Sequence, residues 1–433
     1  MANVIVIGGG LGGLPTAYEL RHLLPKEHRV TLISEHKEFT FIPGLIRVAL
    51  DLNPLEEMQL DLEPLLKKRG IDWIHGRVTH IDPNQQQIRI GEQTLDYDYL
   101  ALATGASLAF DLAPGLGPDT GYTQSVCTPD HALHAREEWL NYLENPQGPL
   151  VVGAMPGAGC FGPAYEFALM ADWEMRRRGV RDRVSITYVT PEPYPGHLGV
   201  GGVKNAEKLT VNLMKKRGIR MIDNAEITAI DCETITLADG EQLPFGYSMI
   251  LPKFRGSHFL QNVPGLTDET GFIPVTNTYR HPKYSSIYAL GVSVKLNQPD
   301  KTQIPIGLPK SGEMTEAMGI AVAHNIAYEL GAFDKPCKPT LEALCFAEFG
   351  DTGIAYVAIP VVPDPETGKR RNAYAVEGRW VVWVKAAFER YFLLKMKWGL
   401  GVPWFEKLGL RILFQVYLTE PLTNNKEQEL LSA

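Results

Sequence analysis

The sequence predicts an α/β protein with two Rossmann-like dinucleotide-binding domains, the first of them discontinuous, and a C-terminal membrane-associating region. Two observations predict the paired domains. A strand, a glycine-rich turn and a helix follow one another at the N-terminus, and the same order returns after Pro149. The length of 433 residues also exceeds what a single ordinary core supports.

The composition is that of a globular protein and excludes several functional classes. Hydrophobic residues make up 45% of the chain, and the formal net charge is −8. Because no basic surplus is available to neutralise phosphates, nucleic-acid binding is not expected. No apolar run reaches the roughly 18 residues of a transmembrane helix, and no signal peptide is visible.

The first βαβ unit carries a dinucleotide fingerprint. A strand, a turn, a helix and a second strand are predicted over residues 4–7, 8–13, 14–23 and 29–34. Gly8 permits the tight turn, Gly10 lets the backbone approach a pyrophosphate, and Gly13 lets the helix pack on the strand. Glu35 follows the second strand, where a carboxylate can bind ribose hydroxyls. The first domain is therefore expected to bind a dinucleotide.

The second unit has lost much of this fingerprint. Its strand, turn, helix and second strand are predicted over residues 150–152, 153–162, 163–178 and 184–190. The fingerprint positions are Gly153, Met155 and Ala158, and a methionine side chain obstructs a pyrophosphate. The following strand ends in Thr190 instead of an acid. A nicotinamide dinucleotide site is therefore degraded or lost, and a divergent but working NADH site is the alternative.

The remaining elements suggest where the domains begin and end. A small hairpin is predicted over residues 87–90 and 94–95, and the chain is expected to return to the first domain with a strand over 286–290 and a helix over 312–330. Two strand-like runs, 355–362 and 380–384, then precede a helical tail. The predicted domains are 1–112 with 271–340, then 113–270, then 341–433.

Three further segments resemble the two-dinucleotide-binding-domain flavoproteins. The run that ends in Ala103-Thr104-Gly105 resembles the segment of that superfamily that passes close to the flavin, and residues 41–44 and 287–291 resemble two others. The resemblance implies that the cofactor is FAD and that Thr104, Gly105 and Gly291 lie beside it. Val292 departs from the pattern, which often has an aspartate there.

The cysteines form neither a disulfide framework nor a metal site by their spacing. Cys127, Cys160, Cys232, Cys337 and Cys345 are an odd, scattered set without a CxxC pair, so no metal is expected. Cys160 lies where the second domain's first helix should begin, and a helix N-terminus lowers the pKa of a thiol. Each cysteine alone is more often a small buried hydrophobe, but this position favours a chemical role for Cys160.

Around these cysteines the chain resembles the sulfide:quinone oxidoreductase family in its bacterial type I form, over nearly its whole length. The motifs that carry the resemblance are those at residues 127–131, 153–166, 196–199, 309–312, 345–351 and 378–389. It implies that Cys160 and Cys345 form a redox pair on one face of the flavin, bridged directly or through sulfur atoms. Cys127 matches a third cysteine, which is covalently attached to the flavin in some members.

The resemblance also implies a reaction. Hydrosulfide would attack the cysteine pair and leave a persulfide on Cys160, two electrons would pass through FAD to a quinone, and further turnovers would give polysulfide or elemental sulfur. Glu166, His131 and His197 match residues suited to proton transfer. Lys310 and Gly312 belong to a matched motif assigned to the cofactor. Cys232 and Cys337 match nothing in the family.

The tail suits a quinone in a membrane. Between Arg379 and Leu418, seven lysines and arginines stand against two glutamates, interleaved with tryptophan, phenylalanine and leucine. This pattern predicts amphipathic helices at a membrane surface, and a helix packed on the core or on a dimer partner is the alternative. The resemblance implies that Phe41, Lys385 and Phe388 line the quinone site.

The expected protein is therefore a peripheral, monotopic membrane enzyme of a prokaryotic plasma or internal membrane, by default on the cytoplasmic face. Its expected partners are sulfide, a membrane quinone and the membrane surface, and the sequence admits a homo-oligomer. Three alternatives stay open: a type II NADH:quinone oxidoreductase, the flavin subunit of a flavocytochrome c sulfide dehydrogenase, and a flavin-binding redox sensor. Met155 and Thr190 argue against the first, and the amphipathic tail argues against the other two.

Overall fold

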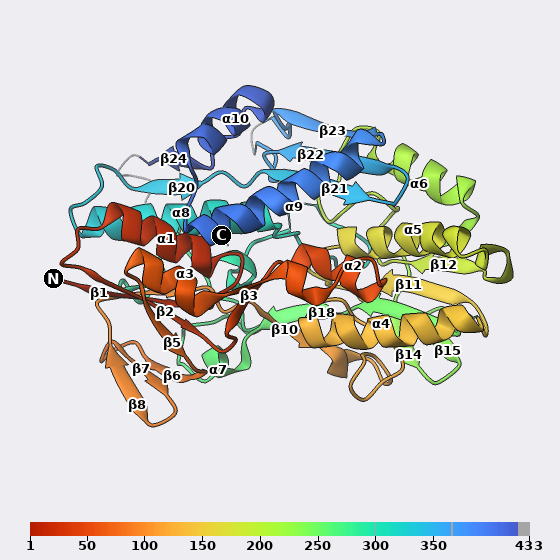
Figure 1. The fold of residues 1–433 in the computed structure, drawn as a ribbon, viewed down its shortest axis with the longest axis horizontal. Helices are drawn as coiled ribbons and strands as arrows, with labels where there is room; N and C mark the ends of the chain where they lie inside the picture. Colours follow the sequence, from red (N-terminus) through yellow and green to blue (C-terminus); the bar gives the residue numbers. More distant parts are fainter. Residues whose placement is uncertain (299, 365–366, 423–433) are drawn as a thin grey trace.

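Two parallel sheets organise the molecule, as Figure 1 shows, and confirm the predicted α/β class with two Rossmann-like units. The computed structural model describes residues 1–298, 300–364 and 367–422. The last residues of the predicted C-terminal region, 423–433, lie outside this description. The domain boundaries near residues 112, 270 and 340 stay predictions.

The first sheet has five parallel strands in the order β19-β9-β1-β2-β5. They are β1 (Asn3–Ile7), β2 (Arg29–Ser34), β5 (Asp72–His75), β9 (Tyr99–Leu102) and β19 (Ile287–Ala289). The helices of this part are α1 (Gly13–Leu23), α3 (Leu62–Arg69) and α8 (Gly312–Glu329). β1 and β9 are almost wholly apolar because helices and neighbouring strands bury both of their faces. The late strand β19 returns the chain to this sheet beside β9.

The second sheet has four parallel strands in the order β13-β12-β11-β17. They are β11 (Leu150–Ala154), β12 (Ile186–Val189), β13 (Ile219–Ile222) and β17 (Tyr247–Leu251). Its helices are α4 (Pro129–Glu144), α5 (Gly162–Arg177) and α6 (Ala206–Lys216), drawn in orange to green in Figure 1. The turn between β11 and α5 carries Cys160, so this sheet positions one of the predicted redox cysteines.

Short antiparallel strands complete these two units. The predicted hairpin belongs to a three-stranded sheet of β6 (Val78–Asp82), β7 (Gln87–Ile90) and β8 (Gln93–Asp96). The others are β14 (Ile227–Ile230) with β15 (Thr234–Leu237) and β16 (Gln242–Pro244), β3 (Glu38–Thr40) with β4 (Gln59–Asp61), and β10 (Ala106–Ala109) with β18 (Lys253–Gly256). Two short helices are α2 (Leu45–Ala49) and α7 (His258–Gln261).

The C-terminal part crosses over both units in Figure 1. It contains an antiparallel sheet of β21 (Ala343–Glu348), β22 (Gly353–Ile359) and β23 (Asn372–Glu377), the helices α9 (Trp380–Trp398) and α10 (Trp404–Phe414), and the pair β20 (Cys337–Pro339) and β24 (Thr419–Pro421). Cys345 lies in the middle of β21, opposite Tyr356 of β22.

The predicted strand over residues 380–384 is wrong: these residues form the first turn of α9. Its β-branched valines favour a strand locally, but tertiary packing overrides that preference. Val381 and Lys385, four residues apart, are both buried, whereas Trp383 between them is 73% exposed. This spacing is that of one buried helix face.

Candidate active site

The turn between β1 and α1 is built for close backbone packing. Gly8 has a φ of +111°, and its N–H donates to the Ile33 carbonyl at 2.8 Å. A Cβ on Gly8 would collide with the Ala103 carbonyl, and one on Gly13 would collide with the Gly8 carbonyl. Gly10 differs, because a Cβ there would meet no heavy atom within 4 Å. This open backbone, three residues before α1 begins, fits the pyrophosphate of a dinucleotide.

Four other predicted cofactor residues follow the carboxyl ends of strands in the same sheet. Glu35 comes directly after β2, and its half-exposed carboxylate lies 3.7 Å from Arg77. Thr104 and Gly105 follow β9, and Gly291 follows the adjacent β19. Because parallel strands end at one edge of a sheet, these residues share the edge at which open α/β sheets bind ligands.

Lys310 lies against the backbone that follows Gly291. Its Nζ donates to the carbonyls of Val292 at 3.2 Å and Val294 at 2.5 Å. Burial lowers the pKa of this lysine to about 7. Gly312, two residues further on, is the first residue of α8. The structure therefore brings Lys310, Gly291 and the start of α8 together, and their role in holding the cofactor stays a prediction.

Cys160 and Cys345 meet at the start of α5. A Cβ built on Gly162 would lie 3.7 Å from the Sγ atoms of both cysteines, so the two sulfurs flank the same point. One comes from the turn after β11 and the other from β21, far apart in the sequence. Both are free thiols here, as is Cys127. Both sulfurs therefore lie close to one point beside α5, and their role as a redox pair stays a prediction.

The expectation of a lowered thiol pKa at Cys160 is wrong for this arrangement. Burial raises the pKa of Cys160 to about 11, and it outweighs the hydrogen bond from the Gly162 N–H, which lowers the pKa. Burial likewise raises the pKa of Cys127 to about 11 and that of Cys345 still further. Cys160 also lies two residues before α5 begins at Gly162, outside the first turn of the helix, where the helix N-terminus would act on it most strongly. Unbridged, these groups are protonated thiols at neutral pH.

Glu166 and Lys385, predicted for different halves of the reaction, form one buried ion pair. Lys385 also lies 3.9 Å from a carboxylate oxygen of Glu348, which Arg47 binds at 2.8 Å. The Glu348 backbone N–H donates to Glu166 at 3.4 Å. Burial lowers the pKa of Lys385 to about 7. The cluster thus joins α5, β21, α2 and α9 around Lys385, whose amine can exchange a proton near neutral pH.

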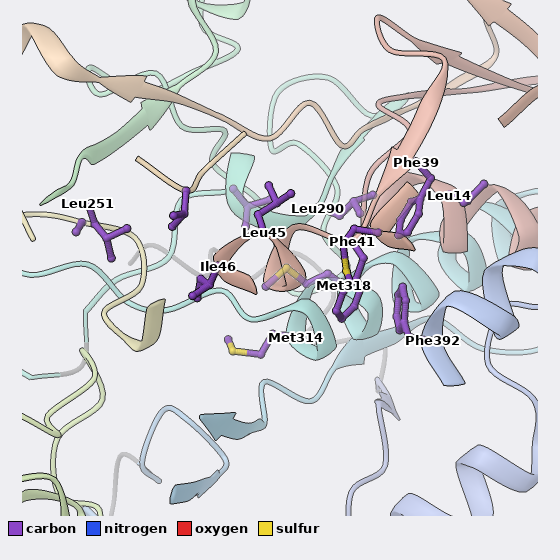
Figure 2. Close-up of a cluster of buried hydrophobic side chains, with 14 of the residues drawn as sticks. Leu14, Phe39, Phe41, Leu45, Ile46, Leu251, Leu290, Met314, Met318 and Phe392 are labelled. Atoms are coloured by element: carbon purple, nitrogen blue, oxygen red, sulfur yellow. The ribbon is translucent and has the colours of Figure 1, made fainter. Parts of the chain in front are cut away.

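Aromatic side chains from the segment before α2 and from α9 pack together. Phe41 and Phe388 do not stack on each other; Phe392 lies between them, with ring centroids 5.5 Å from Phe41 and 6.1 Å from Phe388. Figure 2 shows Phe41 and Phe392 beside Met318 of α8, and Phe39 packs on Phe392 at 6.2 Å. Phe392 was not predicted for this site. Its spacing of four residues from Phe388, within the tail predicted to be helical, places both rings on one helix face and is the signal that could have indicated it.

The two predicted histidines lie in separate places, His131 half-buried and His197 buried. His131 is near the start of α4, with its Nε2 3.8 Å from Asp119 and its ring edge-on to Phe110. His197 has its Nε2 3.0 Å from Asp300. Burial lowers the pKa of both rings. In the described residues, no hydrogen bond joins either histidine to the cysteines or to Glu166.

The second glycine turn is filled by the protein itself. Met155 is buried in the core of its domain, and a Cβ on Gly153 would meet Val189. Thr190 donates a hydrogen bond of 2.8 Å to Glu192, whose carboxylate is wholly buried. No motif in the sequence indicates Glu192. Side chains therefore occupy the end of β12, where the ribose acid of a nucleotide site would stand.

The comparisons with known proteins agree with this geometry. A family model described as pyridine nucleotide-disulphide oxidoreductase matches residues 2–305. The sulfide-quinone reductase of Aquifex aeolicus (strain VF5) is 36% identical over 425 residues, which cover 96% of each protein. This chain belongs to the sulfide-quinone reductases, within the pyridine nucleotide-disulphide oxidoreductase family.

The fold of this sulfide-quinone reductase is also similar to solved structures. The X-ray structure of the sulfide:quinone oxidoreductase from Aquifex aeolicus superposes with a TM-score of 0.93 at 36% identity and covers 98% of both chains. NDH2 from Plasmodium falciparum, solved with NADH, has a TM-score of 0.69 at 14% identity and covers 97% of this chain and 100% of that one, which shows the fold alone.

The family fixes the cofactor. Sulfide-quinone reductases are FAD-dependent flavoproteins, so FAD is the cofactor of this chain. The open backbone at Gly10 and the packed glycines on either side of it fit FAD in the first domain. Met155, at the corresponding position of the second turn, is buried in the core of its domain, and the loss of a second dinucleotide site stays a prediction.

Proposed function

We propose that this chain oxidises hydrosulfide at Cys160 and Cys345 and passes two electrons through FAD to a membrane quinone. The observation that carries the proposal is the meeting of the two sulfurs beside Gly162. They lie at the turn where the second domain has lost its nucleotide fingerprint, so the site suits a sulfur nucleophile better than NADH. The relative from Aquifex aeolicus is a sulfide-quinone reductase, and the alignment covers 96% of its length.

The sulfur step begins from the oxidised Cys160–Cys345 pair. Hydrosulfide attacks the Sγ of Cys160, a new sulfur–sulfur bond forms, the bond between the cysteines breaks, and Cys345 leaves as a thiolate. The hydrosulfide proton is released to a nearby base. Over one cycle, hydrosulfide, quinone and one proton give quinol and one sulfur atom retained on the enzyme. Repetition gives polysulfide or elemental sulfur. Cys127 is proposed as the third cysteine that takes part in this chemistry.

Proton transfer is proposed for three residues. Burial lowers the pKa of the half-buried His131 and of the buried His197, which favours their neutral forms, so each can accept a proton from hydrosulfide or its products. Glu166 contacts Lys385, which can carry a proton toward the quinone because its pKa is near 7. Bound FAD supplies a two-electron acceptor between the sulfur side and the quinone side.

Nine residues are proposed to hold that cofactor. They are Gly8, Gly10, Gly13, Glu35, Thr104, Gly105, Gly291, Lys310 and Gly312. Phe41, Phe388 and Lys385 are proposed to bind the quinone head group, with Phe392 as a fourth wall. Aromatic rings and a buried lysine on the same helix suit a flat quinone with a carbonyl oxygen to polarise.

A steady-state assay tests the proposed function. The purified, FAD-loaded enzyme should reduce a short-chain quinone when sulfide is added, and cyanide should then release the retained sulfur as thiocyanate in equal amount. Because the second dinucleotide site is filled, NADH should support less than about 1% of the sulfide rate. Quinone reduction by NADH at a rate similar to that with sulfide would contradict the proposal.

Attachment to a membrane surface is proposed for α9 and α10. Trp383, Trp404 and Ile412 are 73%, 75% and 68% exposed, which is unusual for large apolar side chains. Exposed Lys397, Lys407 and Arg411 on the same helices suit anionic lipid head groups. In the described part of the chain, no helix is both long and apolar enough to cross a membrane. Surface attachment is compatible with that finding.

Replacing both Trp383 and Trp404 with glutamate should release the enzyme from vesicles of mixed neutral and anionic lipid. Each substitution removes an interfacial anchor and adds a charge of the wrong sign, so the partition coefficient should fall at least about tenfold in a flotation assay. Point substitutions are preferable to truncation, because removing α9 would also remove the buried Phe392 and Met396 and uncover Phe39 and Phe41, on which Phe392 packs. Tyr122→Glu, at an exposed aromatic of the second domain, is the matched control and should leave binding unchanged.

A further inference from the structure

Glu192 is a wholly buried carboxylate just beyond β12, and the reaction proposed above does not use it. Its Oε2 accepts hydrogen bonds from the hydroxyls of Tyr165 and of Thr190, the latter at 2.8 Å, with Tyr188 at 3.4 Å. Its Oε1 accepts the Leu198 backbone N–H at 2.7 Å. Four donors converge on one carboxylate, which is a satisfied and therefore rigid buried network.

This network fixes the turn that carries His197. Tyr165, on α5, donates its hydroxyl to Glu192 and accepts the Gly196 backbone N–H at 2.9 Å. Glu192 holds Leu198, whose φ is +59°, from the other side. The residues before and after His197 are therefore both tied to the same pair of side chains. A bend with positive φ at a leucine needs such support, since it costs free energy on its own.

Gly307 lies between the His197 turn and the loop that carries Cys160, and its backbone is packed closely against both. A Cβ on Gly199 would collide with the Gly307 carbonyl, and a Cβ on Gly307 would lie 2.6 Å from the Ala158 carbonyl. The Gly157 N–H also donates to the Pro305 carbonyl at 2.9 Å. Any shift of the His197 turn would therefore reach the backbone two residues before Cys160.

The carboxylate has no cationic partner within ion-pair distance among the residues that the structure describes. The titratable groups that face it, and whose pKa its charge raises, are Cys160, Tyr165 and Tyr188, with Tyr194 and Tyr356 further out. Burial raises the pKa of Glu192 itself to about 7. Its charge is thus felt at the sulfur that hydrosulfide is proposed to attack.

We propose that Glu192 is a positioning residue of the sulfur side: with Tyr165 it holds the His197 turn against the Cys160 loop and fills the end of the lost nucleotide site. The inference rests on the proposed function. Glu192 acts through Tyr165 and Leu198 and does not itself contact the reacting sulfur atoms. Its loss should impair reduction by sulfide and spare oxidation by quinone, because the quinone-side aromatics are contributed by the β3–α2 segment and α9.

Stopped-flow measurement of the two half-reactions tests this in the full-length, FAD-loaded enzyme. In Glu192→Gln and Tyr165→Phe, flavin reduction by sulfide should be at least about tenfold slower, whereas reoxidation by a short-chain quinone should stay within about twofold. Tyr142→Phe is the matched control. It removes another buried tyrosine hydroxyl of the same domain, which donates to the Gly148 carbonyl at 2.8 Å, and both half-reactions should match wild type.

Alkylation of Cys160 in the reduced enzyme gives a readout that a merely structural role would not move. Above pH 8, where Glu192 is ionised, Glu192→Gln removes a negative charge, lowers the Cys160 pKa and should speed reaction with iodoacetamide several-fold. Thr190→Val, a milder change in the same network, should slow the sulfide half-reaction less than Glu192→Gln does and serves if the latter fails to fold.

Two results would overturn this inference alone, provided that sulfide reduces the wild-type flavin normally. One is equal slowing of both half-reactions in the variants, and the other is wild-type rates in every variant. A wild-type flavin that sulfide leaves oxidised would overturn the proposed function and this inference with it.

Discussion

Replacing Cys160 or Cys345 with serine is expected to lower sulfide-dependent quinone reduction by at least about 10³-fold while FAD stays bound. Both sulfurs flank Gly162, so either substitution removes the sulfur–sulfur bond that hydrosulfide would attack. A serine hydroxyl cannot form that bond or store a sulfur atom. The cofactor should be retained because neither cysteine is among the residues proposed to hold it, and a serine side chain is close in size to a cysteine. Rates come from quinone absorbance and occupancy from the flavin spectrum.

Two other cysteines provide matched controls for this experiment. Cys232 is exposed and Cys337 is buried beside His324, and neither contacts the Cys160–Cys345 pair. Cys232→Ser should match wild type. Cys337→Ser should lower the midpoint of thermal unfolding, since it places a hydroxyl in a buried site, and should leave the rate of sulfide-dependent quinone reduction close to that of wild type. Wild-type-like turnover in Cys160→Ser or Cys345→Ser would refute the cysteine-pair mechanism.

Replacing Lys385 with methionine is expected to slow flavin reoxidation by quinone about 10²-fold and to destabilise the fold by about 3–5 kcal/mol. Lys385 is the buried cation beside Glu166 and Glu348, so its removal leaves buried carboxylates short of a partner. Only Arg47 would still bind Glu348. Stopped-flow reoxidation and denaturant unfolding measure the two effects separately.

Lys397→Met is the control for that substitution. It removes an exposed lysine from the same helix. The rate of reoxidation by quinone should match wild type, and the free energy of unfolding should change by no more than about 0.5 kcal/mol. Sulfide should still reduce the flavin of Lys385→Met. Normal reoxidation by quinone in that variant would remove Lys385 from the quinone side.

Local signals in the sequence predict the first domain well. The strand, glycine turn and helix at the N-terminus agree with β1 and α1 to within one residue, because apolar runs and glycines act locally. The tail was harder. Residues 380–384 look like a strand by their valines, yet Val381 and Lys385 are buried together on one helix face. That outcome depends on packing against distant elements, which local preference does not encode.

Some residues of the candidate site are indicated by motifs, and others are found only in the structure. Motifs indicate Cys160 and Cys345, and the structure makes them neighbours. The raised pKa of both thiols follows from burial, which no motif reports. Phe392 and Arg47 join the site only because α9 and α2 pack close to it, and Glu192 reads as an ordinary loop acid in the sequence. Contacts between elements far apart in the chain are what sequence patterns leave undetermined.

The most direct test of the central claim compares sulfide with NADH as a donor to the bound flavin. Under anaerobic conditions and without quinone, sulfide should bleach the oxidised flavin band of the wild-type enzyme within one turnover time. NADH at the same concentration should leave the band unchanged, because Met155 and the Thr190–Glu192 pair fill the second nucleotide site. Rapid bleaching by NADH, with no response to sulfide, would contradict the account.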